Sequence, residues 1–352
     1  MVQTLECASH APERTFMSTA SSLPPPGAAE QAYICALVVT FNPDPQRLQQ
    51  VVDAIAPQVG AVLVVDNGST QPCDGYLRPP ATPVYYLPLG DNHGIAAAQN
   101  IGLAWCQTQG HSHALLLDQD ALAPPGMAQA LLHEERVRAS RGEKVAGVGP
   151  LIHDPRRGRD APFFRIAPPT MLWVTSADAG EDAARVDLLI AAGHLLPLKA
   201  YEALGPLRES LFIDYVDLEW SLRARHEGWR LYGHYGTRLD HRLGEEPARA
   251  LGRQFMSHSP LRHYYMARNA LALWRMPHVP LTWIMFDAVV LAARLLIFGV
   301  LAHSAGGTRS EHLRMMLRGI WDGTRGRGGR IDQAARDWRV PEEVRRIVPR
   351  RL

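Results

Sequence analysis

The sequence predicts an α/β fold with a mainly parallel, buried sheet and a helical C-terminal region. Three apolar runs, at residues 34–42, 61–66 and 113–118, have the pattern of strands buried on both faces, and the first is also rich in β-branched residues. Helical patterns lie between these runs, which is the alternation expected of a parallel sheet. The 352 residues, 46% of them apolar, are enough for one large domain or two fused subdomains.

The first 32 residues are rich in Ala, Ser and Pro and contain no apolar core of the kind that a signal peptide needs. We expect a disordered extension there, with Met17 as an alternative start. The four cysteines have no metal-ligand spacing, which favours a reduced, cytoplasmic protein. The formal net charge of +2 says little about partners.

Polar residues end the predicted strands. The first strand carries Thr40 and Asn42 at its carboxyl end, and the second ends in Asp66 before an Asn-Gly-Ser turn. A short third strand, 84–87, leads through a Gly-containing loop into a helix that begins near Ile95. Ligands of open α/β sheets bind at these carboxyl ends. No Gly-x-Gly-x-x-Gly follows the first strand, which argues against a dinucleotide dehydrogenase.

The fourth strand ends in Asp118-Gln119-Asp120. Side chains two residues apart in an extended backbone lie on one face, so both carboxylates can share a divalent cation. A hard ion held by carboxylate oxygens can neutralise a departing nucleoside diphosphate. A solvated turn after a buried strand would look the same, so the pair alone is a weak signal.

Four segments in this order resemble the nucleotide half of inverting family 2 glycosyltransferases of the GT-A fold: Val-Val-Thr-Phe-Asn42-Pro, Val-Asp66-Asn-Gly, Asn92-His-Gly94-Ile-Ala-Ala-Ala-Gln-Asn100-x-Gly102 and Leu-Leu-Leu-Asp118-Gln119-Asp120. Later segments narrow the resemblance to the bacterial rhamnosyltransferase branch of rhamnolipid synthesis and O-antigen assembly: Leu211 to Arg223, Asp-His241-Arg-Leu-Gly244, Leu261 to Asn269 and Trp321 to Gly329. The resemblance extends from about Tyr33 to Gly329.

The resemblance implies a dTDP-L-rhamnose donor, a Mg²⁺ or Mn²⁺ ion and a lipid or lipid-linked acceptor. It places Asp66 at the donor base and Asp120 as the main metal ligand, with Asp118 at the ribose or metal. The remaining donor-side candidates are Thr40, Asn42, Asn92, Gly94, Asn100 and Gly193. Turns and helix caps commonly use the same residue types, so each also has a structural interpretation.

The proton acceptor is expected in the second half, because inverting transfer needs a carboxylate that deprotonates the acceptor hydroxyl. The resemblance places this base at Asp217, although Val216 stands where the family has a preceding acid. Asp214 and Glu219 therefore stay open as alternatives. Asp214 could equally be a helix N-cap, and Glu219 could pair with Arg223 one helical turn later.

Further candidates follow this acidic helix. The resemblance places a metal-binding histidine in this region, and imidazole joins carboxylates in Mg²⁺ or Mn²⁺ sites. His241 is therefore a possible third metal ligand, although a lone histidine is more often structural. Arg268 is a candidate clamp for the donor diphosphate. Arg262, Tyr264 and Asn269 share its helical stretch and are secondary candidates, because their spacing also fits plain surface pairing.

Residues 281–301 are almost wholly apolar and long enough to cross a bilayer. Asp287 and Arg294 lie on one helical face and disfavour crossing, so we expect an in-plane helix with this polar stripe turned outward. Twelve arginines and six acidic residues follow residue 301, an excess of six positive charges that would attract anionic lipid headgroups. A core helix with a basic tail is the alternative. No nucleic-acid-binding module is recognised.

We expect four segments: an extension (1–32), a nucleotide-sugar half (33–150), an acceptor half (151–255) and a helical, basic, membrane-associated region (256–352). The expected activity is metal-dependent inverting rhamnosyl transfer at the cytoplasmic face of the inner membrane, with a mono-rhamnolipid as favoured acceptor. Rhamnosyl or other glycosyl transfer in O-antigen or polysaccharide assembly is the alternative. An inactive nucleotide-sugar-binding or scaffold protein is the alternative of another class.

Overall fold

The computed structural model describes residues 33–156, 158–175, 182–241, 248–250, 253–255, 258–301 and 307–352. The expected extension, residues 1–32, and Met17 lie outside this range, as does Gly244. The helices are α2 (Pro45–Ile55), α3 (Ile95–Thr108), α4 (Met127–Ser140), α6 (Leu198–Leu204), α7 (Val216–His226), α8 (Pro260–Leu273), α9 (Leu281–Leu296), α10 (Arg309–Thr324) and α11 (Glu342–Arg345), and a π-helical segment, Ile297–Leu301, extends α9.

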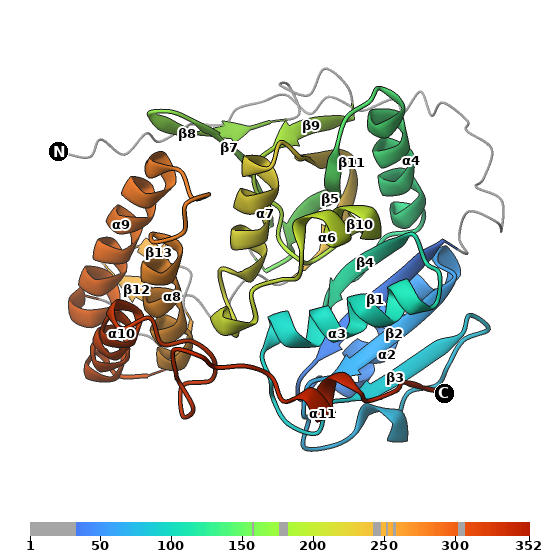
Figure 1. The fold of residues 1–352 in the computed structure, drawn as a ribbon, viewed down its shortest axis with the longest axis horizontal. Helices are drawn as coiled ribbons and strands as arrows, with labels where there is room; N and C mark the ends of the chain where they lie inside the picture. The colour runs from blue at the N-terminus through green and yellow to red at the C-terminus, as the bar shows by residue number, and fades with distance from the viewer. Residues whose placement is uncertain are drawn as a thin grey trace.

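In the described part of the chain, ten strands form one sheet in the order β14-β3-β2-β1-β4-β10-β5-β11-β9, with β6 beside β5 (Figure 1). The parallel strands of its first half are β1 (Ile34–Thr40), β2 (Ala61–Asp66), β3 (Val84–Pro88) and β4 (His113–Asp118). The expected α/β class with a mainly parallel sheet is confirmed.

The second half continues the same sheet. The strand β10 (His194–Pro197) runs antiparallel between β4 and β5 (Val145–Asp154), while β11 (Arg230–Asp240) runs parallel to β5. The expected boundary at residue 150 falls inside β5. The remaining strands are β6 (Arg159–Ala161), β9 (Ala183–Val186), β14 (Arg350–Arg351) and the pairs β7 (Phe163–Ala167) with β8 (Thr170–Val174) and β12 (Ala248–Ala250) with β13 (Arg253–Phe255).

Both faces of the sheet are covered, which explains the unbroken apolar runs. Alternate residues of β1 enter different cores: Leu37 packs in the core that includes α3, and Val38 packs in the core that includes α2 and α4. Asp44 begins α2 by accepting a 2.7 Å bond from the Arg47 amide, as an N-cap residue does. The sheet is therefore a rigid base for its polar carboxyl edge.

The C-terminal helices α8, α9 and α10 lie together beside the sheet (Figure 1). Two glycines one helical turn apart bring α10 against α8, because a Cβ at Gly319 would lie 2.3 Å from the Tyr264 carbonyl and one at Gly323 would lie 2.8 Å from that of Arg268. The chain then returns across the molecule, and β14 pairs with the edge strand β3.

This return shows where the basic residues of the expected helical, basic C-terminal region lie. Several of its arginines bind groups of the protein itself: Arg327 binds Asp322, Arg330 binds Asp91, Arg345 binds Glu209 and Arg350 binds Asp74. The charge excess read from sequence is therefore partly neutralised within the fold. Arg330 and Arg350 tie the tail to loops of the first half of the chain, and Arg345 ties it to Glu209 in the second half.

The expected orientation of α9 is also wrong. Asp287 faces inward, with 2% exposure, and accepts bonds from the Tyr215 hydroxyl (2.6 Å) and the Trp274 indole (2.9 Å). The outward face is apolar instead, with Met285 64% and Val289 69% exposed. The polar stripe holds α9 to the protein and leaves the apolar side open.

Candidate active site

Three predicted site residues meet at the carboxyl edge of the sheet. Thr40 of β1 lies beside Asp66 of β2, and Val39 lies beside Asp118 of β4. Because these strands are parallel and in register, their last residues share one edge. This edge is where the sequence placed the donor.

Asp118, Asp120 and His241 form one cluster at this edge. The His241 Nε2 lies 3.3 Å from an Asp118 oxygen, and its Nδ1 lies 3.2 Å from an Asp120 oxygen. The strand β11 delivers His241, since the Leu122 amide donates to the Asp240 carbonyl at 3.0 Å. Residues 237–240, just before His241, are the end of β11.

The charges of this cluster depend on one another. Burial disfavours a charged His241, but its bond to Asp120 and the nearby carboxylates outweigh burial and raise the pKa of the imidazole. Burial raises the pKa of Asp118, opposed by the His241 charge and reinforced by that of Asp120. For Asp120, burial is outweighed by His241 and Arg47, so its pKa is lowered. The carboxylates give the cluster negative charge, and this charge favours the protonated form of His241.

Two carboxylates and one imidazole make an oxygen and nitrogen donor set that Mn²⁺ or Mg²⁺ can use. Over the described ranges, no group of three or more His, Cys, Asp or Glu side chains is already arranged as a metal site. In this structure the imidazole bridges both carboxylates. The chemistry of the donor set therefore fits a divalent cation, while the arrangement is that of an ion-paired cluster.

Asp217 lies in the first turn of α7, and one of its oxygens accepts a 2.9 Å bond from the Leu218 amide. Burial, followed by the negative charges of Asp118 and Asp214, raises the pKa of Asp217 to about 6, although the Leu218 bond opposes the rise. A carboxylate with this pKa is ionised at neutral pH and is a stronger base than an ordinary aspartate.

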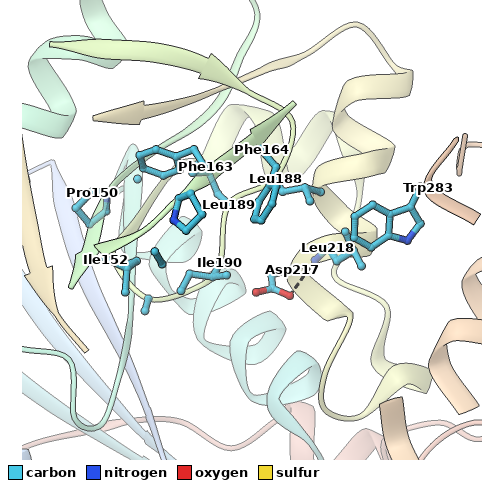
Figure 2. Close-up of a pocket in the computed structure, with 14 residues that line it drawn as sticks. Pro150, Ile152, Phe163, Phe164, Leu188, Leu189, Ile190, Asp217, Leu218 and Trp283 are labelled. Carbon is cyan, nitrogen blue, oxygen red and sulfur yellow. Dashed lines mark hydrogen bonds between the residues drawn. The ribbon is translucent and has the colours of Figure 1, made fainter. Parts of the chain in front are cut away.

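A cavity of about 280 Å³ opens beside Asp217. Among the described residues that line it, Asp217 alone has an ionisable side chain. Figure 2 shows its carboxylate among apolar side chains from three parts of the chain: Phe163 and Phe164, Leu188 to Ile190, and Trp283. The cavity can accept an apolar group next to a base.

The two alternative bases are occupied elsewhere. Glu219 is fully buried and bonds Arg223 at 2.9 Å and His278 at 3.1 Å, which outweighs burial and lowers its pKa. Asp214 is paired with both Nε and Nη2 of Arg262. Glu219 is therefore the ion-pair partner of Arg223, as its structural interpretation expected, and Asp217 is the carboxylate that faces the cavity.

The loop 90–95, which contains the donor-side candidates Asn92 and Gly94, packs against the segment that precedes Asp217. The Asn92 side chain accepts from the Asn67 amide group at 3.1 Å and from the Gly94 amide at 3.0 Å. Gly94 has φ +87°, and a Cβ there would lie 2.6 Å from the Phe212 carbonyl, which accepts from Ile95 at 2.7 Å. Gly94 is thus needed for this contact, and the first amide of α3 is already bonded.

The donor-base candidates surround Asp66. This buried carboxylate accepts from the Tyr86 hydroxyl at 2.7 Å and from the Ser69 amide at 2.8 Å. Thr40 is buried and bonds the Val65 carbonyl, whereas Asn42 is exposed and accepts from the Thr70 amide at 2.8 Å. Asp66 and Asn42 stay at the edge where a base could bind, and Thr40 supports the strand end.

Two further donor candidates have structural contacts that account for them. The Asn100 side chain is buried and bonds the Leu207 amide and carbonyl, both at 2.9 Å. Gly193 has φ +82°, and a Cβ there would lie 2.5 Å from the Pro150 ring. We reassign Asn100 from donor contact to the junction between α3 and the 207–209 segment.

The candidates on α8 also have structural roles. The buried Arg268 guanidinium donates to the backbone carbonyls of Leu211 (2.8 Å), Ser210 (3.2 Å) and Gly329, so we reassign it from the donor diphosphate to support of this loop. Asn269 donates to the carbonyls of the same loop. Tyr264 is buried and donates to Asp322 at 2.9 Å.

Residues 35–136 match the family model described as Glycosyl transferase family 2. These residues form a family 2 glycosyltransferase domain, and the chain is a glycosyltransferase. Its α/β architecture is the GT-A fold, as the resemblance implied. Among curated relatives, the glycosyltransferase is 29% identical over 301 residues to dTDP-rhamnosyl transferase RfbF of Shigella flexneri, covering 85% of this chain and 98% of the relative.

It is also 26% identical to N-acetylglucosaminyl-diphospho-decaprenol L-rhamnosyltransferase of Mycobacterium tuberculosis, covering 76% of this chain and 94% of the relative. Among solved structures, the crystal structure of GalNAc-T7 with UDP, GalNAc and Mn²⁺ has a TM-score of 0.49 at 15% identity over 74% of this chain. The glycosyltransferase spans 55%, about half, of that chain.

Several side chains around the glycosyltransferase site were not identified from sequence. Gln119, between the two predicted ligands, accepts from the Phe41 amide at 2.8 Å, and Arg47 donates to the Asp120 carbonyl at 2.8 Å. Trp283 lines the cavity from α9. No motif marks Arg47 or Trp283, because each acts from a distant element; Gln119 could have been found from its position alone.

Proposed function

We propose that this glycosyltransferase transfers L-rhamnose from dTDP-L-rhamnose to a lipid or lipid-linked acceptor, with inversion at the anomeric carbon. The observation that supports this donor is the alignment with a protein named dTDP-rhamnosyl transferase, which covers 98% of that relative. Asp66 and Asn42 are the proposed contacts to the donor base at the edge of the sheet.

Asp118, Asp120 and His241 are the residues that would hold a Mg²⁺ or Mn²⁺ ion. When bound, such an ion neutralises the charge that develops on the departing diphosphate. The support is the donor set: two carboxylates within 3.3 Å of one imidazole, at the edge of the sheet. The Gln119 side chain accepts from the Phe41 amide, and Arg47 donates to the Asp120 carbonyl. These two bonds hold residues 119 and 120 in place and keep both carboxylates at this edge.

Asp217 is the proposed general base. It would take the proton of the acceptor hydroxyl while that oxygen attacks the sugar from the face opposite the diphosphate. Its pKa of about 6 and its position in an apolar cavity both favour proton transfer there. Asp214 and Glu219 are held in ion pairs and are poor candidates for this step.

Two acceptor classes have separate support. The name of the mycobacterial relative contains a decaprenol diphosphate that carries N-acetylglucosamine, which favours a polyprenyl-diphosphate-linked sugar. The apolar cavity beside Asp217 favours a mono-rhamnolipid, because it could accept part of an acyl chain. We favour the polyprenyl-linked class, because the alignment with that relative covers 94% of its length.

An anionic membrane surface, at the cytoplasmic face of the inner membrane, is the proposed location. The segment Leu281–Leu301 is long and apolar enough to cross a membrane by length and composition. Its Asp287, however, is bonded to Tyr215 and Trp274, which anchors the helix to the catalytic part. An in-plane helix that inserts its apolar outward face therefore suits it better than a spanning one.

The test is a reaction panel with the full-length protein. Purified enzyme is incubated with dTDP-, UDP- and GDP-sugars, Mn²⁺ or Mg²⁺, and either acceptor class in detergent. We expect mass spectrometry to show rhamnose added only from dTDP-L-rhamnose, and proton NMR to show an α-linkage from the β-configured donor. A β-linked product would rule out inversion. Donor binding without any product would favour the inactive binding protein.

A further inference from the structure

The segment just before Asp217 has an unusual backbone. Phe212, Asp214 and Tyr215 all have positive φ, at +67°, +62° and +65°, which non-glycine residues adopt rarely. Such a conformation is strained and persists only where its surroundings hold it. The position of Asp217 therefore depends on the groups that hold this loop, residues 210–217.

Two helices hold it. Arg268 and Asn269 of α8 bind its backbone carbonyls from residues 210 to 214. At its end, Tyr215 extends its hydroxyl to α9, where Asp287 accepts it at 2.6 Å. The Tyr215 hydroxyl also lies 3.5 Å from the Arg294 Nη1 of α9. Tyr215 is the N-cap residue of α7, so its conformation determines the direction in which that helix begins.

We propose that Tyr215 and Asp287 are positioning residues that hold Asp217 at the cavity. This inference rests on the proposed role of Asp217 as base. Asp287 is 2% exposed on the inward side of α9, and its second oxygen is bonded to the Trp274 indole at 2.9 Å. The carboxylate is thus fixed from one side by Trp274 and in turn fixes Tyr215 from the other.

Loss of the Tyr215 bond should act on catalysis and not on donor binding. The donor edge is built from β1, β2 and β4, which do not contact Tyr215 through any bond described above. A base displaced by a fraction of an ångström to 1 Å lowers the rate of proton transfer by about 10- to 100-fold. We therefore expect a lower kcat with an unchanged donor KM.

Two variants form a matched pair, because each removes one hydrogen bond to the same carboxylate. Tyr215→Phe removes the bond that leads to Asp217, and Trp274→Phe removes the bond that does not. We expect Tyr215→Phe to lower kcat about 10-fold or more at unchanged donor KM, and Trp274→Phe to stay within about threefold of wild type. Equal kcat values for the two variants would overturn the inference.

Conservative replacement of Asp287 gives a rescue. Asp287→Asn keeps an oxygen that accepts from Tyr215 and should retain most of kcat, whereas Asp287→Leu removes every acceptor and should match Tyr215→Phe. A loss as large in Asp287→Asn as in Asp287→Leu would contradict the role of the Tyr215 bond. Retention of fold is checked by thermal unfolding, and donor binding by calorimetry.

Hydrogen–deuterium exchange separates this inference from the proposed function, since it needs neither donor nor acceptor. Amides of residues 212–218 should exchange faster in Tyr215→Phe than in Trp274→Phe, with wild type slowest. Equal exchange in both variants overturns the positioning role even if the enzyme is active. If no rhamnosyl product forms but this difference in exchange is seen, the proposed function is refuted and the positioning role is not.

Discussion

Replacing Asp217 by Asn should inactivate the enzyme and also stabilise it. The amide has the size of the carboxylate and can still accept the bond from the Leu218 amide, but it cannot take a proton. Loss of a general base lowers rates by about 100- to 10,000-fold, so we expect kcat to fall at least 100-fold. Donor binding should persist, because Asp217 lines the apolar cavity and not the edge of β1, β2 and β4 where the donor is proposed to bind.

The stabilisation follows from the pKa of Asp217. Burial raises it from 3.8 to about 6, so the folded protein binds this proton more tightly than the unfolded chain does. Stability is therefore greatest below the unfolded pKa and is lost as pH rises through the folded one. At about 1.36 kcal/mol per pKa unit, the ionised carboxylate costs about 2 to 3 kcal/mol above pH 6.

The Asn variant has no such cost. Its free energy of unfolding should exceed that of wild type by about 2 to 3 kcal/mol at pH 8, which for a chain of this size is about 3 to 4 °C in Tm. The advantage should shrink toward pH 4. Thermal unfolding at both pH values, beside a dTDP-release assay, measures both effects. Near-normal turnover, or a variant less stable than wild type at pH 8, would refute this assignment of Asp217.

Three other changes test the remaining assignments. Asp120→Ala should abolish transfer and metal-dependent donor binding while the Tm changes little, and full activity in EDTA would contradict a metal site. Glu219→Gln should lower stability by about 1 to 3 kcal/mol but leave kcat within a few-fold, with the loss smaller near pH 4, because the pKa of Glu219 is lowered in the fold; a 100-fold loss of kcat would make Glu219 the base. The double variant Met285→Asp with Val289→Asp should no longer float with anionic liposomes but should still glycosylate a detergent-solubilised acceptor, and unchanged flotation would exclude α9 as the lipid contact.

The sheet and its polar edge could be predicted because they depend on local pattern. A strand buried on both faces must be apolar throughout, so β1, β2 and β4 were visible as continuous runs. Parallel strands place their last residues at one edge, which brought Asp66 and Asp118 together. His241 joined them by resemblance alone, since no local pattern shows that Asp240, at the end of β11, pairs with Leu122 just after β4.

The partners of long polar side chains could not be predicted. Arg268 has the residue type of a diphosphate clamp, but the carbonyls of residues 210 and 211, some 57 positions earlier, take its donors. Asp287 and Arg294 share a helical face as expected, yet which face points inward depends on Tyr215 and Trp274. Such choices are made by tertiary contacts that helical periodicity does not encode.

The C-terminal helices and tail contact both the cavity beside Asp217 and the loop before it. Trp283 lines the cavity beside Asp217, Asp287 accepts a hydrogen bond from Tyr215, and the Gly329 carbonyl accepts one from the Arg268 guanidinium that supports the loop before Asp217. A truncation that removes α9 would remove all three at once, so lost activity could not be assigned to lost membrane binding. The two roles lie on opposite faces of α9, with Asp287 inward and Val289 outward, and only substitutions on one face at a time can separate them.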